Sequence, residues 1–144
     1  MTTKVAQRIY LRALNLAAVL KSKSSFLLGP RMTGKSSLIR ETLPDALVFD
    51  LLNSEDFLPL LESPSFLGRT IPSDIEIVVI DQIQNAPQLL DEVHRLIETR
   101  GIRFLLTGSS ARKLRRGGVN LLGGRAGTIH FHPFWYESWV TISA

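Results

Sequence analysis

Residues 25–37, SFLLGPRMTGKSS, place a short apolar segment before a glycine-bounded loop and the start of a helix. Within them, Gly29, Gly34, Lys35 and Ser36 have the spacing of a P-loop, G-x-x-x-x-G-K-S. The glycines permit a close approach that a side chain would obstruct. Successive N–H groups can therefore point inward and, with the positive end of the following helix, hold phosphate oxygens. The stretch predicts a phosphate-binding loop between a strand and a helix.

Two side chains of the loop have distinct expected roles. Lys35 is expected to reach the β- and γ-phosphates, and the hydroxyl of Ser36 is expected to ligate Mg²⁺. Arg31, inside the loop, is expected to face solvent, with phosphate contact as the alternative. The residues predicted to bind the nucleotide are Gly29, Pro30, Arg31, Met32, Thr33, Gly34, Lys35, Ser36 and Ser37.

Composition indicates a globular domain. The chain has 144 residues, of which 44% are hydrophobic and 21% charged, and its net charge is +4. It has no cysteine, which excludes a disulfide framework and cysteine-based metal or nucleophile sites and fits a reducing cytoplasm, the expected location. The apolar run 13–20 is too short to cross a bilayer, and no small-residue cleavage site follows it, so neither a membrane span nor a signal peptide is predicted.

Hydrophobic periodicity predicts alternating elements. Strands are expected at 25–28, 46–52, 75–81, 102–107 and 128–131. Helices are expected at 4–20, 34–43 and 53–61, and a further helix from an N-cap at Asn85 to a stop at Gly101, while 63–74 is expected to be a loop with one turn of helix. This alternation predicts an α/β fold of three layers, with a sheet of about five mostly parallel strands.

Asp81 ends the most strongly apolar of these strands. Open α/β sheets bind their ligands at the carboxyl ends of the strands. Asp81 is therefore predicted to hold a water on the Mg²⁺ that Ser36 ligates, making Ser36 and Asp81 the metal residues. The alternative is a carboxylate that caps a turn.

Four motifs, in order, resemble a known family: GPRMTGKS at 29–36, IDQIQNAP at 80–87, LTGSS at 106–110, and Gly124-Arg125. They look like those of a large prokaryotic group of AAA+-like P-loop ATPases, and the resemblance covers nearly the whole chain. It implies ATP and Mg²⁺ as cofactors, and it is the only basis for preferring adenine to guanine. It also implies an additional-strand sheet, in which the strand ending at Thr107 lies between the P-loop strand and the Asp81 strand.

The resemblance also implies roles for three residues. Thr107 or Ser109 would be the sensor group within reach of the γ-phosphate; the alternative is turn formation, since Gly-Ser-Ser is good loop chemistry. Arg125 would be an arginine finger acting on its own nucleotide or on a neighbour's. The alternative for Arg125 is a solvated side chain in a glycine-rich loop.

Position 82 departs from the family pattern. The family has Asp-Glu, with the glutamate as base or water-positioning group, whereas this chain has Asp81-Gln82. Glutamine cannot accept a proton as a carboxylate does, but it can orient a water. The sequence therefore predicts a nucleotide-binding domain with weak or conditional hydrolysis. The catalytic candidates are Lys35, Gln82, Thr107, Ser109 and Arg125.

One domain is predicted over 1–144, with an N-terminal helix at 1–21, a nucleotide-binding core at 22–132 and the start of a truncated C-terminal region at 133–144. Family members usually continue further, and aromatic side chains crowd into 131–139. In a longer protein these side chains would pack against the missing domain; in this chain they are expected to be partly exposed, where they favour aggregation or binding to a partner such as another copy in an oligomer.

Three rival functions stay open at this point. A nucleotide-dependent switch that does not hydrolyse is made plausible by Gln82, and a small-molecule kinase shares the loop. A nucleic-acid-associated ATPase is suggested by a basic cluster, for which a solvated helix face is the alternative. That cluster consists of Arg112, Lys113, Arg115 and Arg116.

Overall fold

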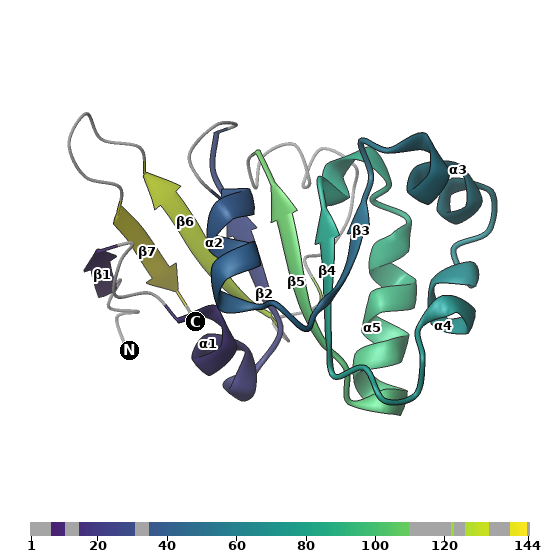
Figure 1. The fold of residues 1–144 in the computed structure, drawn as a ribbon, viewed down its shortest axis with the longest axis horizontal. Helices are drawn as coiled ribbons and strands as arrows, with labels where there is room; N and C mark the ends of the chain where they lie inside the picture. The colour runs from purple at the N-terminus through teal and green to yellow at the C-terminus, as the bar shows by residue number, and fades with distance from the viewer. Residues whose placement is uncertain are drawn as a thin grey trace.

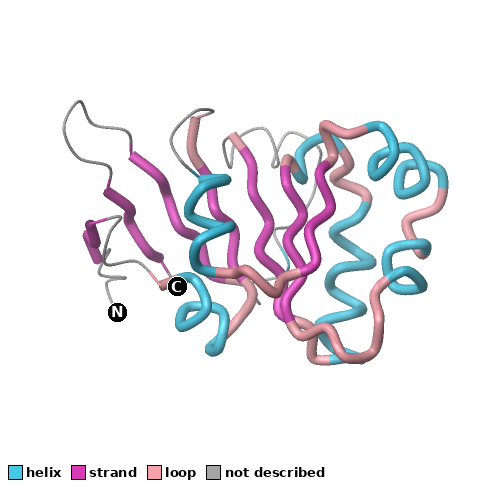
Figure 2. The backbone as a smooth tube through the Cα atoms, in the orientation of Figure 1, coloured by secondary structure: helices cyan, strands magenta, loops and turns pink. Residues whose placement is uncertain are grey.

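The computed structural model describes residues 7–10, 15–30, 35–109, 122, 126–132 and 139–143. In these ranges the strands form one sheet, and helices flank it on both faces (Figures 1 and 2). The strands are β1 (Gln7–Tyr10), β2 (Ser25–Leu28), β3 (Leu47–Asp50), β4 (Ile77–Asp81), β5 (Arg103–Gly108), β6 (Gly127–His132) and β7 (Trp139–Ser143). The helices are α1 (Leu16–Ser22), α2 (Lys35–Thr42), α3 (Ser54–Glu62), α4 (Phe66–Thr70), the 3-10 helix η2 (Ile83–Asn85) and α5 (Leu89–Arg100).

The sheet has the order β1-β7-β6-β2-β5-β4-β3. From β6 to β3 all neighbouring strands are parallel, and β5 lies between β2 and β4. This confirms the α/β fold and the additional-strand order. Because these five parallel strands run the same way, their carboxyl ends meet at one edge of the sheet, the upper edge in Figure 1.

Two hydrophobic cores lie on opposite faces of the sheet, as alternation along each strand requires. In β2, Leu27 belongs to one core while Phe26 and Leu28 belong to the other. The core under α1 and α2 consists of Leu16, Leu20, Leu27, Leu38, Ile39, Leu43, Val79, Leu105, Ile129 and Phe131. The other core contains the buried side chains of α3, α4 and α5 together with the opposite faces of β2, β4 and β5. Burial on both faces explains the continuous apolar runs of these strands.

The helix expected over 4–20 is wrong in its first half. Gln7–Tyr10 is the strand β1, and the helix α1 begins only at Leu16, where the side chain of Asn15 accepts a hydrogen bond from the N–H of Ala18. β1 pairs antiparallel with β7, at the far end of the chain. The apolar residues of this segment have helical spacing, but the segment pairs with a strand more than a hundred positions away and is therefore extended. Local periodicity carries no information about so distant a partner.

The predicted tail at 133–144 contains a second unpredicted strand. β7 pairs antiparallel with β6 on one side and with β1 on the other, so Trp139–Ser143 is part of the same sheet as the P-loop strand. The side chain of Ile142 packs against the core under α1 and α2. The predicted division of the chain at 132 and 133 stays a prediction, although the sheet itself continues across that point.

The predicted start of α5 is also wrong. Asn85 ends the 3-10 helix η2, and α5 begins at Leu89. Between β4 and α5, the side chains of Ile83 and Ala86 are buried and anchor the chain as it leaves β4. The predicted stop is confirmed, because Gly101 caps α5 with a positive φ of 65°. The expected turn of helix within 63–74 is α4. No helix among the described residues is long and apolar enough to cross a membrane.

Candidate nucleotide-binding site

The P-loop begins where β2 and β5 end side by side. The N–H of Gly29 donates to the carbonyl oxygen of Gly108 over 3.0 Å. A Cβ on Gly29 would lie 2.5 Å from the Cβ of Phe131 on β6, closer than carbon atoms approach. Glycine is therefore required here by packing against β6 as well as by the loop that follows. The predicted loop residues Arg31, Met32, Thr33 and Gly34 lie outside the described residues.

Lys35 opens α2 and turns its side chain inward. It is 7% exposed, and its Nζ donates to the carbonyl oxygen of Gly29 over 2.6 Å and to that of Gly108 over 3.0 Å. A buried ammonium requires such partners, because the charge is expensive to remove from water. The structure thus holds a positive charge between the carboxyl ends of β2 and β5. Ser36 and Ser37 lie exposed on the first turn of the same helix.

A second cluster lies at the ends of β4 and β5. The hydroxyl of Thr107, which is fully buried, donates to Oδ1 of Asp81 over 2.5 Å. The same hydroxyl oxygen accepts a hydrogen bond from the backbone N–H of Gln82 over 3.0 Å. Gln82 has left-handed backbone angles, φ 65° and ψ 52°, which a residue with a side chain adopts only at a cost. Thr107 therefore orients the carboxylate and holds the strained turn that follows it.

Gln84 belongs to this cluster and was not among the predicted site residues. Its Nε2 donates to Oε1 of Gln82 over 2.5 Å, and the Nε2 of Gln82 in turn faces Oδ1 of Asp81 at 3.5 Å. Two buried side-chain oxygens in the described part of the chain have no hydrogen-bond partner, namely Oε1 of Gln84 and Oγ of Ser109. A Cβ on Gly108 would lie 2.9 Å from Oε1 of Gln84, so this amide packs directly on the end of β5. The available signal was a second amide side chain two positions after Gln82.

The structure therefore brings together Lys35, Asp81, Gln82, Thr107 and Ser109 at one edge of the sheet. Arg125 lies outside the described residues, and so do Arg112, Lys113, Arg115 and Arg116. Their predicted roles as arginine finger and nucleic-acid contacts stay predictions.

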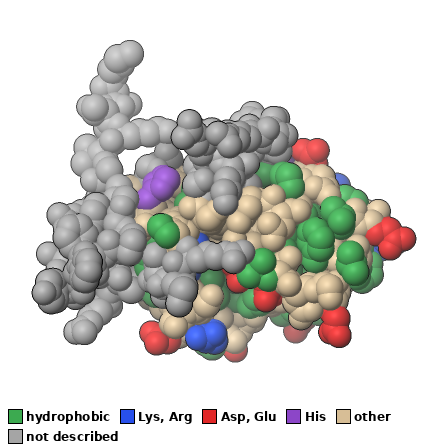
Figure 3. All heavy atoms as spheres, turned by 90° about the horizontal axis from the view of Figure 1, so that it is seen from above, with side chains coloured by type: hydrophobic (Ala, Val, Ile, Leu, Met, Phe, Trp, Pro, Cys, Tyr) green, Lys and Arg blue, Asp and Glu red, His purple; other side chains and the backbone are tan. Residues whose placement is uncertain are grey.

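One flank of this edge, beside β3 and α3, presents mainly hydrophobic and acidic side chains among the described residues. Figure 3 looks down on the carboxyl ends of the strands, and on the side of β3 and α3 its exposed side chains are mainly hydrophobic, with acidic ones at the rim. Leu52 and Leu58 are the most exposed large hydrophobic residues described, at 55% and 57%. The first turn of α3 adds the acidic Glu55 and Asp56. This flank does not suit contact with nucleic-acid phosphates.

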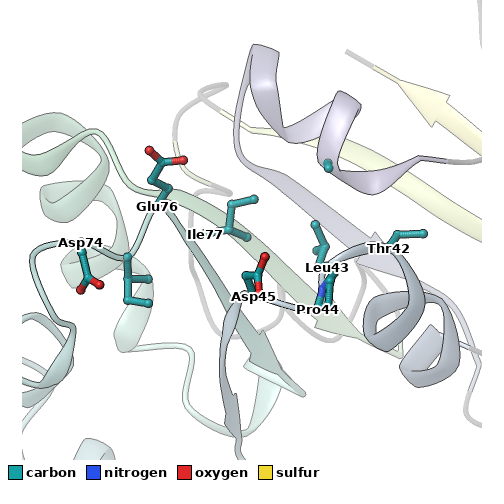
Figure 4. A pocket seen from close by; sticks show the side chains of 10 residues that line it. Thr42, Leu43, Pro44, Asp45, Asp74, Glu76 and Ile77 are labelled. Atoms are coloured by element: carbon teal, nitrogen blue, oxygen red, sulfur yellow. The ribbon is translucent and has the colours of Figure 1, made fainter.

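A pocket of about 280 Å³ lies at the other edge of the sheet. It is lined by the end of α2 and the segment after it, and by the residues that lead into β4 (Figure 4). Three carboxylates line it, those of Asp45, Asp74 and Glu76. None of the predicted site residues is among its lining residues, and its negative charges oppose phosphate binding. The predicted site residues that the structure describes lie at the carboxyl ends of the strands, away from this pocket.

The strand order and the inward-turned Lys35 define the class of protein, a P-loop NTPase of the additional-strand type. A family model described as "AAA domain" matches residues 21–139, and the chain belongs to this family of AAA+-like P-loop ATPases. No curated protein sequence matches the chain.

Two solved structures are similar in fold. One is described as Drosophila ORC bound to GC-rich DNA and Cdc6, with 14% identity and a TM-score of 0.52, covering 83% of this chain and 54% of the other. The second is described as Drosophila ORC bound to AT-rich DNA and Cdc6, with 15% identity and a TM-score of 0.46, covering 72% of this chain and 47% of the other. The chain spans about half the length of these chains. At such identity the first match shows the fold alone.

Proposed function

We propose that this P-loop ATPase domain binds ATP with Mg²⁺ and hydrolyses it weakly or only under specific conditions. The observation that carries the proposal is the position of Lys35, whose buried ammonium lies between the carbonyl oxygens of Gly29 and Gly108. A phosphate group entering the loop would offer this ammonium charged oxygen partners in place of neutral ones. ATP as the nucleotide follows from family membership.

The donors at this edge fit a magnesium ion. Mg²⁺ prefers oxygen ligands and commonly takes one or two from the protein, the others being phosphate and water. Ser36 supplies a hydroxyl on the first turn of α2, and Asp81 supplies a carboxylate at the end of β4. When bound, the ion would neutralise charge on the phosphates. Thr107 would keep the carboxylate of Asp81 oriented by the hydrogen bond that it already donates.

Ser109 is the better candidate for the sensor role. The hydroxyl of Thr107 is already used by Asp81 and by the N–H of Gln82. Oγ of Ser109 is buried and has no hydrogen-bond partner in the described part of the chain, so this hydroxyl is available to bind a ligand directly after β5. Arg125 remains the proposed arginine finger.

Gln82 is the reason to expect slow turnover. An amide can orient a water through its oxygen but cannot take up the proton that a carboxylate would accept. The oxygen of Gln82 is also engaged by Gln84. This contact favours a second candidate function, a nucleotide-dependent switch that binds ATP without hydrolysing it.

Nucleic-acid association is a weaker proposal. It rests on the basic cluster at 112–116. Binding to short duplexes should then weaken steeply as salt is raised, because counterions are released on binding. Absence of salt-dependent binding would rule this proposal out.

The decisive experiment measures ATP binding by calorimetry in the chain and in Lys35→Ala. The variant should lose measurable affinity, because the only buried lysine of the described residues would be removed from the loop. Lys21→Ala, which removes an exposed lysine of α1, is the matched control and should bind ATP as the chain does. Equal ATP affinity in Lys35→Ala and the control would refute the proposed site. Phosphate release by the chain and by Gln82→Glu then separates enzyme from switch.

A further inference from the structure

Gln84 has no role in holding phosphate or metal in the function proposed above, yet it is tied into the site. It lies in the 3-10 helix η2, directly after β4, and its side chain reaches back to Gln82. Its amide also lies against the end of β5, next to Gly108. The carbonyl oxygen of Gly108 in turn accepts from the Nζ of Lys35. Gln84 thus contacts both the turn after β4 and Gly108 at the end of β5, the residue whose carbonyl oxygen binds Lys35.

The direction of the two amides is determined by Asp81. A carboxylate only accepts hydrogen bonds, so the Nε2 of Gln82 must be the atom that faces it. The oxygen of Gln82 then faces Gln84, and Gln84 must present its own Nε2 to it, at 2.5 Å. The oxygen of Gln84 is left against Gly108 without a partner in the described residues. Reversing either amide would put two acceptors or two donors face to face.

This arrangement directs the oxygen of Gln82, the atom that would orient a water, toward Gln84. Gln82 is 6% exposed, and both ends of its amide are engaged, one toward Asp81 and the other with Gln84. The left-handed backbone at Gln82 is held by Thr107, so the backbone offers the side chain little freedom to turn away. We infer that Gln84 is a positioning residue that locks the side chain at position 82, so that the resting site cannot place the attacking water. This inference rests on the proposed ATPase function.

The lock should act in opposite directions on glutamine and on glutamate. Gln82 has one acceptor oxygen; the hydrogen bond from Gln84 uses one of its two lone pairs and fixes its direction, so that removing Gln84 frees this oxygen to turn toward water. A glutamate at 82 would have two acceptor oxygens. Gln84 would then hold one of them by its Nε2, while the other, which would take the place of the Nε2 facing Asp81, would be repelled by that carboxylate and turn toward water. Removing Gln84 would release a carboxylate that needs to be held.

The test is a set of four proteins: the chain, Gln84→Met, Gln82→Glu, and the variant with both changes. Methionine keeps the length of the side chain and removes its amide. Steady-state phosphate release from ATP should rise about fivefold in Gln84→Met relative to the chain, the equivalent of one hydrogen bond. It should fall about fivefold when Gln84→Met is added to Gln82→Glu. In both pairs KM for ATP should change little, because Gln84 is not expected to touch the phosphates.

A merely structural role for Gln84 would shift turnover the same way in both backgrounds, and that result would overturn the inference. Absence of turnover in all four proteins would overturn it as well, provided that they bind ATP. A chain that fails to bind ATP would instead refute the proposed function. Gln88→Met is the control, because Gln88 is exposed and makes no side-chain cap to α5. As an independent readout, hydrogen exchange of the Gln82 side-chain amide, followed by NMR, should quicken in Gln84→Met and stay unchanged in the control.

Discussion

Replacing Thr107 by valine should reveal how much of the stability of this site rests on one hydroxyl. The side chain is fully buried and valine has nearly the same shape, so that the change removes the hydroxyl and little else. It breaks the hydrogen bond donated to Oδ1 of Asp81, and it leaves the N–H of Gln82 buried without an acceptor. Each loss typically costs about 1–3 kcal/mol.

The two losses share one atom and are not additive. We therefore expect Thr107→Val to lower the free energy of unfolding by about 3 kcal/mol, and to lower Tm by about 10 °C for a domain of this size. Thr107→Ser is the matched control, since it keeps the hydroxyl and removes one methyl group. It should lose about 1 kcal/mol.

The assay is urea unfolding followed by circular dichroism, with the three proteins compared at the same pH and salt. Amide hydrogen exchange adds a local measurement, in which the N–H of Gln82 should lose its protection in the valine variant and keep it in the serine variant. If Thr107→Val and Thr107→Ser differ by less than about 0.5 kcal/mol, the hydroxyl does not hold the ends of β4 and β5 together and this account of the site is wrong.

Three further changes test other contacts. Gly29→Ala should destabilise the fold by about 1–3 kcal/mol in urea unfolding and weaken ATP binding, because the new Cβ would meet Phe131 of β6; an unchanged midpoint would contradict that packing. Gly101→Ala should cost about 1 kcal/mol through its positive φ alone, since nothing lies within 4 Å of the new Cβ, and Gly101→Asn should cost less. Arg100→Met should lower the free energy of unfolding by about 1–2 kcal/mol, because Arg100 donates to three backbone oxygens in α4 and the segment after it. Amide hydrogen exchange in the segment that joins α4 to β4 should become faster. Exchange equal to that of the unchanged chain would argue against this contact.

The central sheet could be predicted from the sequence because its signals are local. A strand buried on both faces reads as a continuous apolar run, and 75–81 is such a run, found as β4 at Ile77–Asp81. The P-loop spacing placed Lys35 at the start of a helix, where the structure has it. The strand order followed from the family resemblance, and the contacts of β5 with β2 and β4 confirm it.

The strands β1 and β7 could not be predicted in this way. They pair with each other from opposite ends of the chain, and β1 has no run of residues that demands a strand by itself. The choice between strand and helix at Gln7–Tyr10 was made by a partner strand, and therefore by contacts that are distant in sequence.

The sequence by itself determined the P-loop spacing, a carboxylate at the end of a buried strand and a glutamine directly after it. Only the tertiary structure decided what surrounds them. It placed the hydroxyl of Thr107 between Asp81 and Gln82, and it brought the amide of Gln84 onto the oxygen of Gln82. Hydrogen bonds between side chains depend on the angles at which strand ends and turns meet in space, and residue order does not record those angles.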